Sequence, residues 1–267
     1  MTSSPETEHA SRPRARFDLS HLRDSKAAAY VGPFLVFLVL LQLIQWIKTD
    51  REDASWWLAQ PEHWGYPFQA IVCLGLLWFW RRHYPIISGR GFGLAFLGGI
   101  IGIAIWLLPP LLHSRFGLGS EEMLPWLRWL GFRERLEGFN PFLFGEQTSL
   151  PLLVLIVGLR FLRLVVAVSF VEEIFWRGFL MRFLTDPDAD WKTTSLKQCS
   201  AKSIGLTAIA FALVHLGPDT AVALVYGALV GWVTVKTGNL YAAIFMHAVS
   251  NLILGMFILM SGWWGLW

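Results

Sequence analysis

The sequence is poor in charged residues. They make up 15% of the 267 residues, whereas a soluble domain has roughly 25%. Hydrophobic residues make up 55% of the chain, and the mean hydropathy is +0.49. The chain therefore has too little polar surface for a water-soluble domain and enough apolar length to cross a bilayer several times.

Several common site signals are also missing. Cys73 and Cys199 are the two cysteines and belong to no CxxC or Cys/His spacing, so we expect two unpaired thiols without a special role. The net charge of +3 is small and the basic residues are scattered, which excludes the basic patch of a nucleic-acid-binding protein. HExxH and GxSxG do not occur, so nothing indicates a zincin or a hydrolase with a nucleophile elbow.

Long apolar segments dominate what is present. A helix that spans the membrane needs about 20 apolar residues, and we expect spans at 27–47, 66–80, 93–112, 149–184, 203–216, 219–235 and 240–260. Many of the 15 tryptophans lie at segment ends, where aromatic belts contact the headgroups. The sequence thus predicts an all-α, polytopic transmembrane helix bundle with about 7–8 membrane-spanning helices.

The segment 149–184 is too long for a single perpendicular crossing. It would measure ~54 Å as a helix, against a hydrocarbon core of ~30 Å. We expect it to break, protrude or fold back near 158–163, and it supplies an eighth span if 149–162 crosses separately. The chain then divides into a polar N-terminal tail (1–26), N-terminal helices with a long loop (27–148) and a catalytic core (149–267). No small-residue cleavage site follows the first span, so we expect an uncleaved first helix.

Lysine and arginine gather at one end of the predicted bundle. Three lysines follow the 149–184 segment (Lys192, Lys197 and Lys202), and Lys236 lies in a short loop on the same side. The opposite loop at 217–218 and the tail 261–267 contain neither residue type. Because basic loops stay in the cytoplasm, we expect that end and the N-terminal tail there. The chain is then a multi-pass protein of the plasma (inner) membrane.

Polar side chains recur inside three apolar segments, as Glu172, Glu173, Arg177, His215, His247 and Asn251. An ionisable residue in a span costs at least ~2.5 kcal/mol and is a functional candidate by default. Glu173 and Arg177 are four residues apart, so we predict a neutralising ion pair. Glu172 lies about 100° away around the helix and is free to face a polar pocket.

The depths of these side chains agree with one another. At 1.5 Å per residue from the predicted cytoplasmic ends, Glu172 and His215 lie ~18 Å deep, Asn251 ~16 Å and His247 ~10 Å. We therefore expect all four in one layer of the membrane, in a site that opens to the cytoplasmic side.

These residue types suit the activation of water. A carboxylate among apolar groups can serve as a general base, a histidine can share the water, and an Asn amide is a donor for a developing oxyanion. We expect no cofactor, because Glu173 is committed to Arg177 by its spacing and no local chelate holds a metal. Zinc bound by Glu172, His215 and His247 is the alternative.

Three motifs follow one another on successive predicted helices: EExxxR at 172–177, FxxxH at 211–215 and HxxxN at 247–251. In this order they resemble the CAAX prenyl protease type II family, also called CPBP, over roughly residues 150–255. That family also contains bacteriocin-processing and immunity proteins. The opening segment 30–37 and the many tryptophans resemble its exosortase-associated branch.

The resemblance implies an intramembrane endopeptidase. By this resemblance, Glu172 is the base that activates water, and His215 assists it. His247 and Asn251 form the oxyanion side of the site, and Glu173 and Arg177 match the remaining motif positions. The implied partners are membrane lipid and a peptide or protein substrate, either lipidated or carrying a C-terminal sorting segment. Two alternatives stay open. One is a catalytically silent scaffold or immunity protein of the same fold, and the other is a proton-relaying transporter, which should show internal repeats that the sequence lacks.

Overall fold

The computed structural model describes residues 20–51, 53–142 and 149–267, and these residues form helices and connecting segments without a β-strand. Residues 1–19 of the predicted polar tail and 143–148 of the predicted long loop lie outside them. The long helices are α2 (Lys26–Ile47), α4 (Glu62–Phe79), α5 (Phe92–Phe116), α9 (Ala201–Val214), α10 (Thr220–Thr237) and α11 (Leu240–Ser261). Short helical elements among the described residues are α1 (Ser20–Asp24), α3 (Trp56–Ala59) and 3-10 helices at Arg81–His83, Pro125–Leu130, Leu196–Gln198 and Trp264–Leu266.

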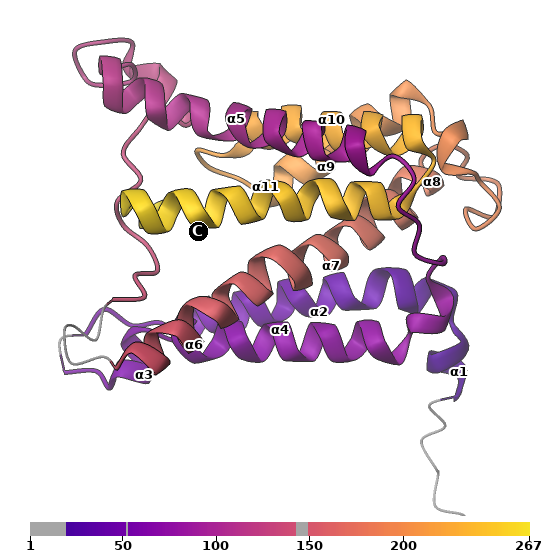
Figure 1. The fold of residues 1–267 in the computed structure, drawn as a ribbon, viewed down its shortest axis with the longest axis horizontal. Helices are drawn as coiled ribbons and strands as arrows, with labels where there is room; N and C mark the ends of the chain where they lie inside the picture. Colours follow the sequence, from indigo (N-terminus) through magenta and orange to yellow (C-terminus); the bar gives the residue numbers. More distant parts are fainter. Residues whose placement is uncertain (1–19, 52, 143–148) are drawn as a thin grey trace, which may run out of the picture.

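A further long helix, Leu150–Phe183, is composite. It consists of α6 (Leu150–Phe161), a π-helical stretch Leu162–Val168, α7 (Ser169–Glu173), a second π-helical stretch Ile174–Leu180, and α8 (Met181–Phe183). The predicted break near 158–163 is therefore wrong, and 149–162 is not a separate crossing. The widened π-turns keep the backbone hydrogen-bonded inside the helix, so nothing forces a break. The helix runs diagonally across the bundle (Figure 1), and tilt accommodates a long helix.

Each predicted span corresponds to a helix, but not every helix has the length and apolarity of a span. Among the described residues, five helices meet both conditions: Lys26–Ile47, Phe92–Phe116, Leu150–Phe183, Thr220–Thr237 and Leu240–Ser261. α9 has 14 residues, and at about 21 Å it is shorter than the bilayer core. α4 begins with the polar residues Glu62 and His63. The chain is an integral membrane protein with a polytopic helix bundle, and the count of seven crossings stays a prediction.

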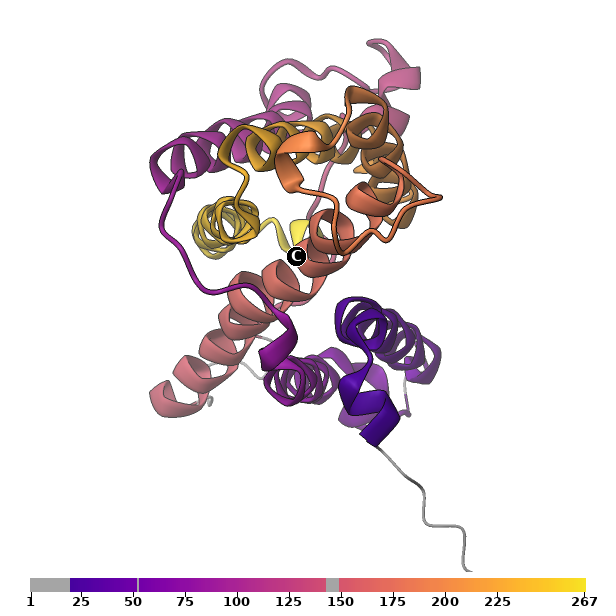
Figure 2. The same cartoon turned by 90° about the vertical axis from the view of Figure 1, so that its right-hand side faces the viewer.

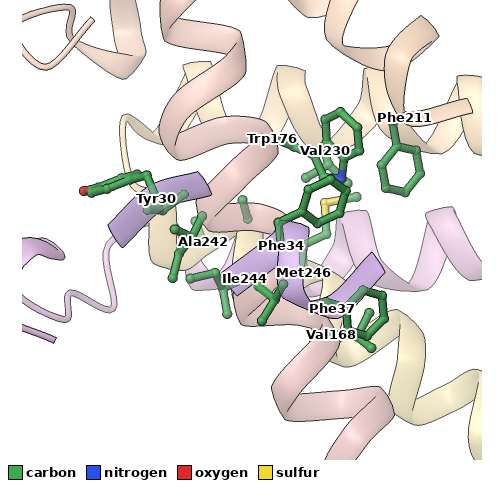
Figure 3. Close-up of a cluster of buried hydrophobic side chains, with 14 of the residues drawn as sticks. Tyr30, Phe34, Phe37, Val168, Trp176, Phe211, Val230, Ala242, Ile244 and Met246 are labelled. Carbon is green, nitrogen blue, oxygen red and sulfur yellow. The ribbon is translucent and has the colours of Figure 1, made fainter. Parts of the chain in front are cut away.

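The helices form two groups with the composite helix between them. Figures 1 and 2 show α2 and α4 side by side on one side, and α5, α9, α10 and α11 together on the other. Aromatic and aliphatic side chains fill the space between the groups (Figure 3). Phe34 of α2 stacks on Phe175 of the composite helix with ring centroids 4.2 Å apart, and Trp176 meets Phe211 of α9 at 5.8 Å. The composite helix is thereby packed from both sides.

Two glycines let α5 approach α10 and α11 closely. A Cβ atom on Gly99 would lie 2.9 Å from the backbone oxygen of Met246, and one on Gly102 would lie 2.6 Å from the ring of Tyr226. Small residues at such points allow membrane helices to pack backbone against backbone. Ser250 of α11 uses this approach to donate a hydrogen bond to the carbonyl oxygen of Gly99 at 3.0 Å.

Candidate active site

Two neighbouring carboxylates lie at the end of α7, between the two π-helical stretches. Glu172 is 6% exposed and Glu173 is fully buried. Successive residues of a helix point about 100° apart, so the two side chains meet different surroundings. Glu172 lines a pocket, and its Oε2 has no hydrogen-bond partner. The expectation that Glu172 faces a pocket is confirmed.

The pocket encloses about 170 Å³, which is room for several water molecules. Glu172, His215, His247 and Asn251 all line it, so the prediction that they meet is confirmed. The other lining residues come from α5, the composite helix, α9–α11 and the C-terminal segment: Gly102, Ile103, Trp106, Leu164, Val168, Phe211, Asp219, Tyr226, Ser250, Leu254, Leu266 and Trp267.

Glu173 and Arg177 form the predicted ion pair. Nη1 of Arg177 donates to Oε1 of Glu173 at 2.9 Å, and both side chains are fully buried. Nη2 of Arg177 donates to the carbonyl oxygen of Gly227 at 2.9 Å, which ties the composite helix to α10. The ion pair thus fixes the helix that carries Glu172.

Glu173 has a second partner that the spacing did not reveal. Nδ1 of His247 lies 2.8 Å from the same Oε1. The inference that Glu173 is committed to Arg177 alone is therefore wrong, because one carboxylate oxygen accepts from both groups. The carboxylate can only accept, so Nδ1 of His247 carries a proton and Nε2 remains for the pocket.

His215 is held in the same way at the end of α9. Its Nδ1 lies 2.9 Å from the carbonyl oxygen of Phe211, one helical turn earlier. A carbonyl oxygen only accepts, so Nδ1 donates and Nε2 of the neutral ring is an acceptor. The rings of Phe211 and Trp106 flank the imidazole, with centroids 4.4 and 5.8 Å away. Both histidines of the pocket therefore have a fixed orientation and a free Nε2.

Asn251 joins α11 to the first π-helical stretch. Its Nδ2 donates to the carbonyl oxygen of Leu164 at 2.8 Å. Only one of the two N–H bonds is used in this way, so the other N–H and the amide oxygen remain for the pocket that Asn251 lines.

Sequence reasoning missed several side chains of the pocket. Tyr226 of α10 donates to Ser250 at 3.1 Å and lies 5.7 Å from the ring of His247. Asp219, which precedes α10, pairs with Arg135 of the segment between α5 and α6 at 2.6 Å. Trp267 lines the pocket from the C-terminal segment. A tyrosine within an apolar span was a signal for Tyr226, whereas Trp267 looked like an ordinary interfacial tryptophan.

The lining residues indicate which end of the bundle the pocket reaches. His215 directly follows α9, Asp219 directly precedes α10, and Trp267 follows α11. These helices succeed one another through short connections, so the end of α9, the start of α10 and the end of α11 share one end of the bundle. The 184–200 segment leads into the start of α9, at the opposite end. The lining does not fit the expectation of an opening on the side of that segment.

Carboxylates and imidazoles are the side-chain types that bind zinc in proteins, and the pocket contains both. Among the described residues, no group of three His, Cys, Asp or Glu side chains lies close enough to hold a metal ion. The set Glu172, His215 and His247 therefore does not fit a metal in the observed arrangement. Each imidazole nevertheless donates its Nδ1 proton to an oxygen, as metal-binding histidines do.

Comparison with known families gives a match to this part of the chain. The family described as type II CAAX prenyl endopeptidase Rce1-like matches residues 154–253, from α6 into α11. No curated protein and no solved structure in the comparisons matches the chain. The matched segment contains all seven defined residues of the three motifs, and the exosortase-associated branch stays a hypothesis. The match over residues 154–253 thus supports a relation of this part of the chain to the CAAX prenyl protease type II (CPBP) family.

Proposed function

We propose that this protein is an intramembrane endopeptidase that uses Glu172 to activate water. The observation that carries the proposal is the Glu172 carboxylate, which has an unpartnered oxygen in a pocket shared with His215, His247 and Asn251. A buried carboxylate with a free oxygen and room for water beside it suits a general base. The family match supports a CAAX-type protease.

The proposed reaction begins with a water molecule between Glu172 and His215. Glu172 takes a proton from this water as the oxygen attacks the carbonyl carbon of the substrate, and it later returns the proton to the leaving nitrogen. Nε2 of His215 accepts a hydrogen bond from the second O–H of the water, because Nδ1 already donates to the carbonyl oxygen of Phe211. The fixed tautomer aligns the water before attack.

The developing oxyanion needs donors on the other wall of the pocket. Asn251 offers its second N–H. His247 can donate from Nε2 only when both ring nitrogens are protonated, and the adjacent Glu173 stabilises that cation. We infer that Glu173 orients His247, while Arg177 holds the Glu173 carboxylate in place.

We propose that this chemistry needs no tightly bound zinc, because the described residues do not bring three ligands together. The purified protein should keep its activity in a strong chelator and contain much less than one zinc per chain. About one zinc per chain, with activity lost on removal and restored on addition, would assign Glu172, His215 and His247 as ligands instead.

The position of the pocket in the bundle indicates from which side of the membrane a substrate would enter. The basic loops favour a cytoplasmic location for the 184–200 segment, and the pocket extends toward the other end. We therefore propose that the substrate enters from the non-cytoplasmic half of the plasma (inner) membrane. A membrane-associated substrate with a lipid group or a C-terminal sorting segment suits a pocket at this depth.

The test is a proteomic comparison of membranes from cells with the wild-type protein and with Glu172→Gln. The wild type should yield shortened forms of one or a few membrane proteins, and the variant should accumulate their full-length forms. Identical peptide termini in both membranes, at equal expression, would favour a catalytically silent protein.

A further inference from the structure

A second pocket, which we call the basic pocket, lies at the end of the bundle opposite the candidate active site. It encloses about 400 Å³, within the range of small-molecule sites, about 300–1,000 Å³. Its walls come from the start of α2, the segment after α4, the end of the composite helix and the start of α11. Figure 1 shows α1 and α8 at this end. The basic pocket shares no lining residue with the pocket of Glu172, so the proposed reaction does not use it.

The lining carries positive charge without a counter-ion. Lys26, His83 and Arg182 line the basic pocket, and its lining contains no acidic residue. Among the residues that the structure describes, none of the three forms a salt bridge. Asp24 precedes Lys26 by two residues but pairs with Arg82. A concave surface with charge of one sign attracts an ion of the opposite sign, so the basic pocket suits an anion.

The guanidinium of Arg182 is fixed in place by neutral acceptors. Three of its five N–H bonds donate to backbone carbonyl oxygens, at 2.7, 2.8 and 3.3 Å. Its plane also lies over the ring of Trp191, 5.5 Å from the centroid. These contacts orient the cation and leave its charge uncompensated. Two N–H bonds of Arg182 and the ammonium group of Lys26 therefore remain for a ligand.

Two tyrosines give the basic pocket a fixed shape. The hydroxyl of Tyr30 donates to the carbonyl oxygen of His83 at 3.2 Å, and the hydroxyl of Tyr84 donates to that of Ala29 at 2.8 Å. These reciprocal bonds join α2 to the segment after α4, and the two rings meet edge to face at 5.6 Å. Tyrosines are typical of the headgroup level of a membrane, which indicates the depth of the pocket.

The surroundings of the basic pocket favour a lipid over a soluble anion. Ile86 and Ile87 directly follow the lining residue Pro85 and are 93% and 73% exposed. Phe183, next to Arg182, is 37% exposed. Large apolar side chains this exposed at the ends of membrane helices fit contact with acyl chains. A soluble phosphate would use the cations but not these side chains.

We propose that the basic pocket binds the phosphate headgroup of an anionic phospholipid. Its phosphate would accept hydrogen bonds from Lys26 and from the unused N–H bonds of Arg182. A zwitterionic headgroup carries a cation of its own, which the same two side chains repel. The basic loops favour the cytoplasmic leaflet for this end of the bundle, and basic pockets between helices on that side are typical sites for anionic headgroups.

A lipid in this place would also connect separate helices. Gly178 lines the basic pocket and directly follows Arg177 in the composite helix. Tyr30 of α2 packs on it so closely that a Cβ atom on Gly178 would lie 2.9 Å from the tyrosine ring. A bound headgroup therefore bridges α2 and the helix that carries Glu172. We expect anionic lipid to raise the melting temperature of the protein.

The test measures binding of single lipids to the full chain in a non-ionic detergent by native mass spectrometry. The probes are phosphatidylglycerol and phosphatidylcholine with identical acyl chains. The wild type should bind phosphatidylglycerol at least about tenfold more tightly, and Lys26→Gln should lower that preference about fivefold, the effect of one lysine near a charged headgroup. Lys236→Gln is the matched control and should leave the preference unchanged. Lys236 is an exposed lysine in the last turn of α10, at the same end of the bundle, and lies outside the pocket.

Equal affinities for the two lipids would overturn the proposal, as would equal effects of Lys26→Gln and Lys236→Gln, which would indicate net charge alone. Displacement of phosphatidylglycerol by an equal concentration of glycerol 3-phosphate would assign the pocket to a soluble phosphate instead. If Lys26→Gln does not fold, phosphatidylglycerol with a photoreactive headgroup tests the wild type directly. Cross-links should map to 26–30, 83–85 or 178–182, and cross-links only elsewhere would overturn the proposal. None of these outcomes depends on cleavage, so the proposed function can fail independently.

Discussion

Nδ1 of His247 lies 2.8 Å from Oε1 of Glu173, the same oxygen that accepts from Arg177 at 2.9 Å. This arrangement links residues on two helices, 74 positions apart in the chain. The two adjacent carboxylates therefore differ in their contacts. Glu173 accepts hydrogen bonds from a histidine and an arginine, whereas Oε2 of Glu172 has no hydrogen-bond partner and its side chain lines the pocket.

The first prediction compares the two carboxylates by stability. Glu173→Gln removes the charge that compensates Arg177 and leaves only a neutral amide oxygen to accept from His247, so it should cost about 3–5 kcal/mol of unfolding free energy. Glu172→Gln should change it by about 1 kcal/mol or less, because the Oε2 of Glu172 has no partner to lose. Thermal unfolding in detergent measures both variants. Equal losses would contradict the division of roles.

The second prediction concerns Asn251. Asn251→Ala should cost about 1–3 kcal/mol, because it leaves the Leu164 carbonyl oxygen without this donor. It should also lower kcat by about 100-fold through the loss of an oxyanion donor. Thr234→Ala is the matched control, since it removes a buried hydrogen bond to Val230 inside α10. A control that lowers kcat as strongly would show that packing, and not the amide, explains the effect.

The third prediction concerns helix packing. Gly99→Ala should destabilise the protein, because its Cβ would meet the Met246 carbonyl oxygen at 2.9 Å. Gly75→Ala meets nothing within 4 Å and should stabilise α4 by about 0.5–1 kcal/mol. A lower melting temperature for Gly99→Ala and a higher one for Gly75→Ala, each relative to the wild type, would support the packing. A stabilising Gly99→Ala would show that α5 and α11 lie further apart.

The fourth prediction concerns orientation. A thiol at Asp188→Cys should react with an impermeant maleimide only from the cytoplasmic side of sealed vesicles, and a thiol at Glu122→Cys only from the other side. Both native cysteines are buried and form no disulfide bond, and Cys199 is the one closer in sequence to position 188. Burial raises the pKa of the Cys199 thiol, so it stays protonated at neutral pH and reacts slowly. The opposite labelling pattern would place the pocket end in the cytoplasm.

Local spacing predicted the parts of the site that lie on one helix. The Glu173–Arg177 pair and the free direction of Glu172 follow from helical periodicity, and the depths of His215 and Asn251 gave the common pocket. The helices begin and end within a few residues of the predicted limits. These features depend on the 3.6-residue turn of the helix and on hydropathy, and both can be read from the sequence alone.

Contacts between segments far apart in the chain could not be predicted from the sequence. The His247–Glu173 hydrogen bond depends on how α11 meets the composite helix, and periodicity carries no information about that. The same is true of Trp267, which meets both Arg160 and the pocket. The unbroken helix from Leu150 to Phe183 was missed because the length argument assumed a helix perpendicular to the membrane.

The rate of peptide-bond cleavage by purified protein, compared between wild type and Glu172→Gln, tests the central claim most directly. A substrate identified from the membrane comparison would be incubated with each protein in detergent at matched concentrations of folded chain. Because Glu172 is the proposed base, we predict a fall of at least about 100-fold with an unchanged melting temperature. Cleavage by Glu172→Gln at the wild-type rate would contradict the account.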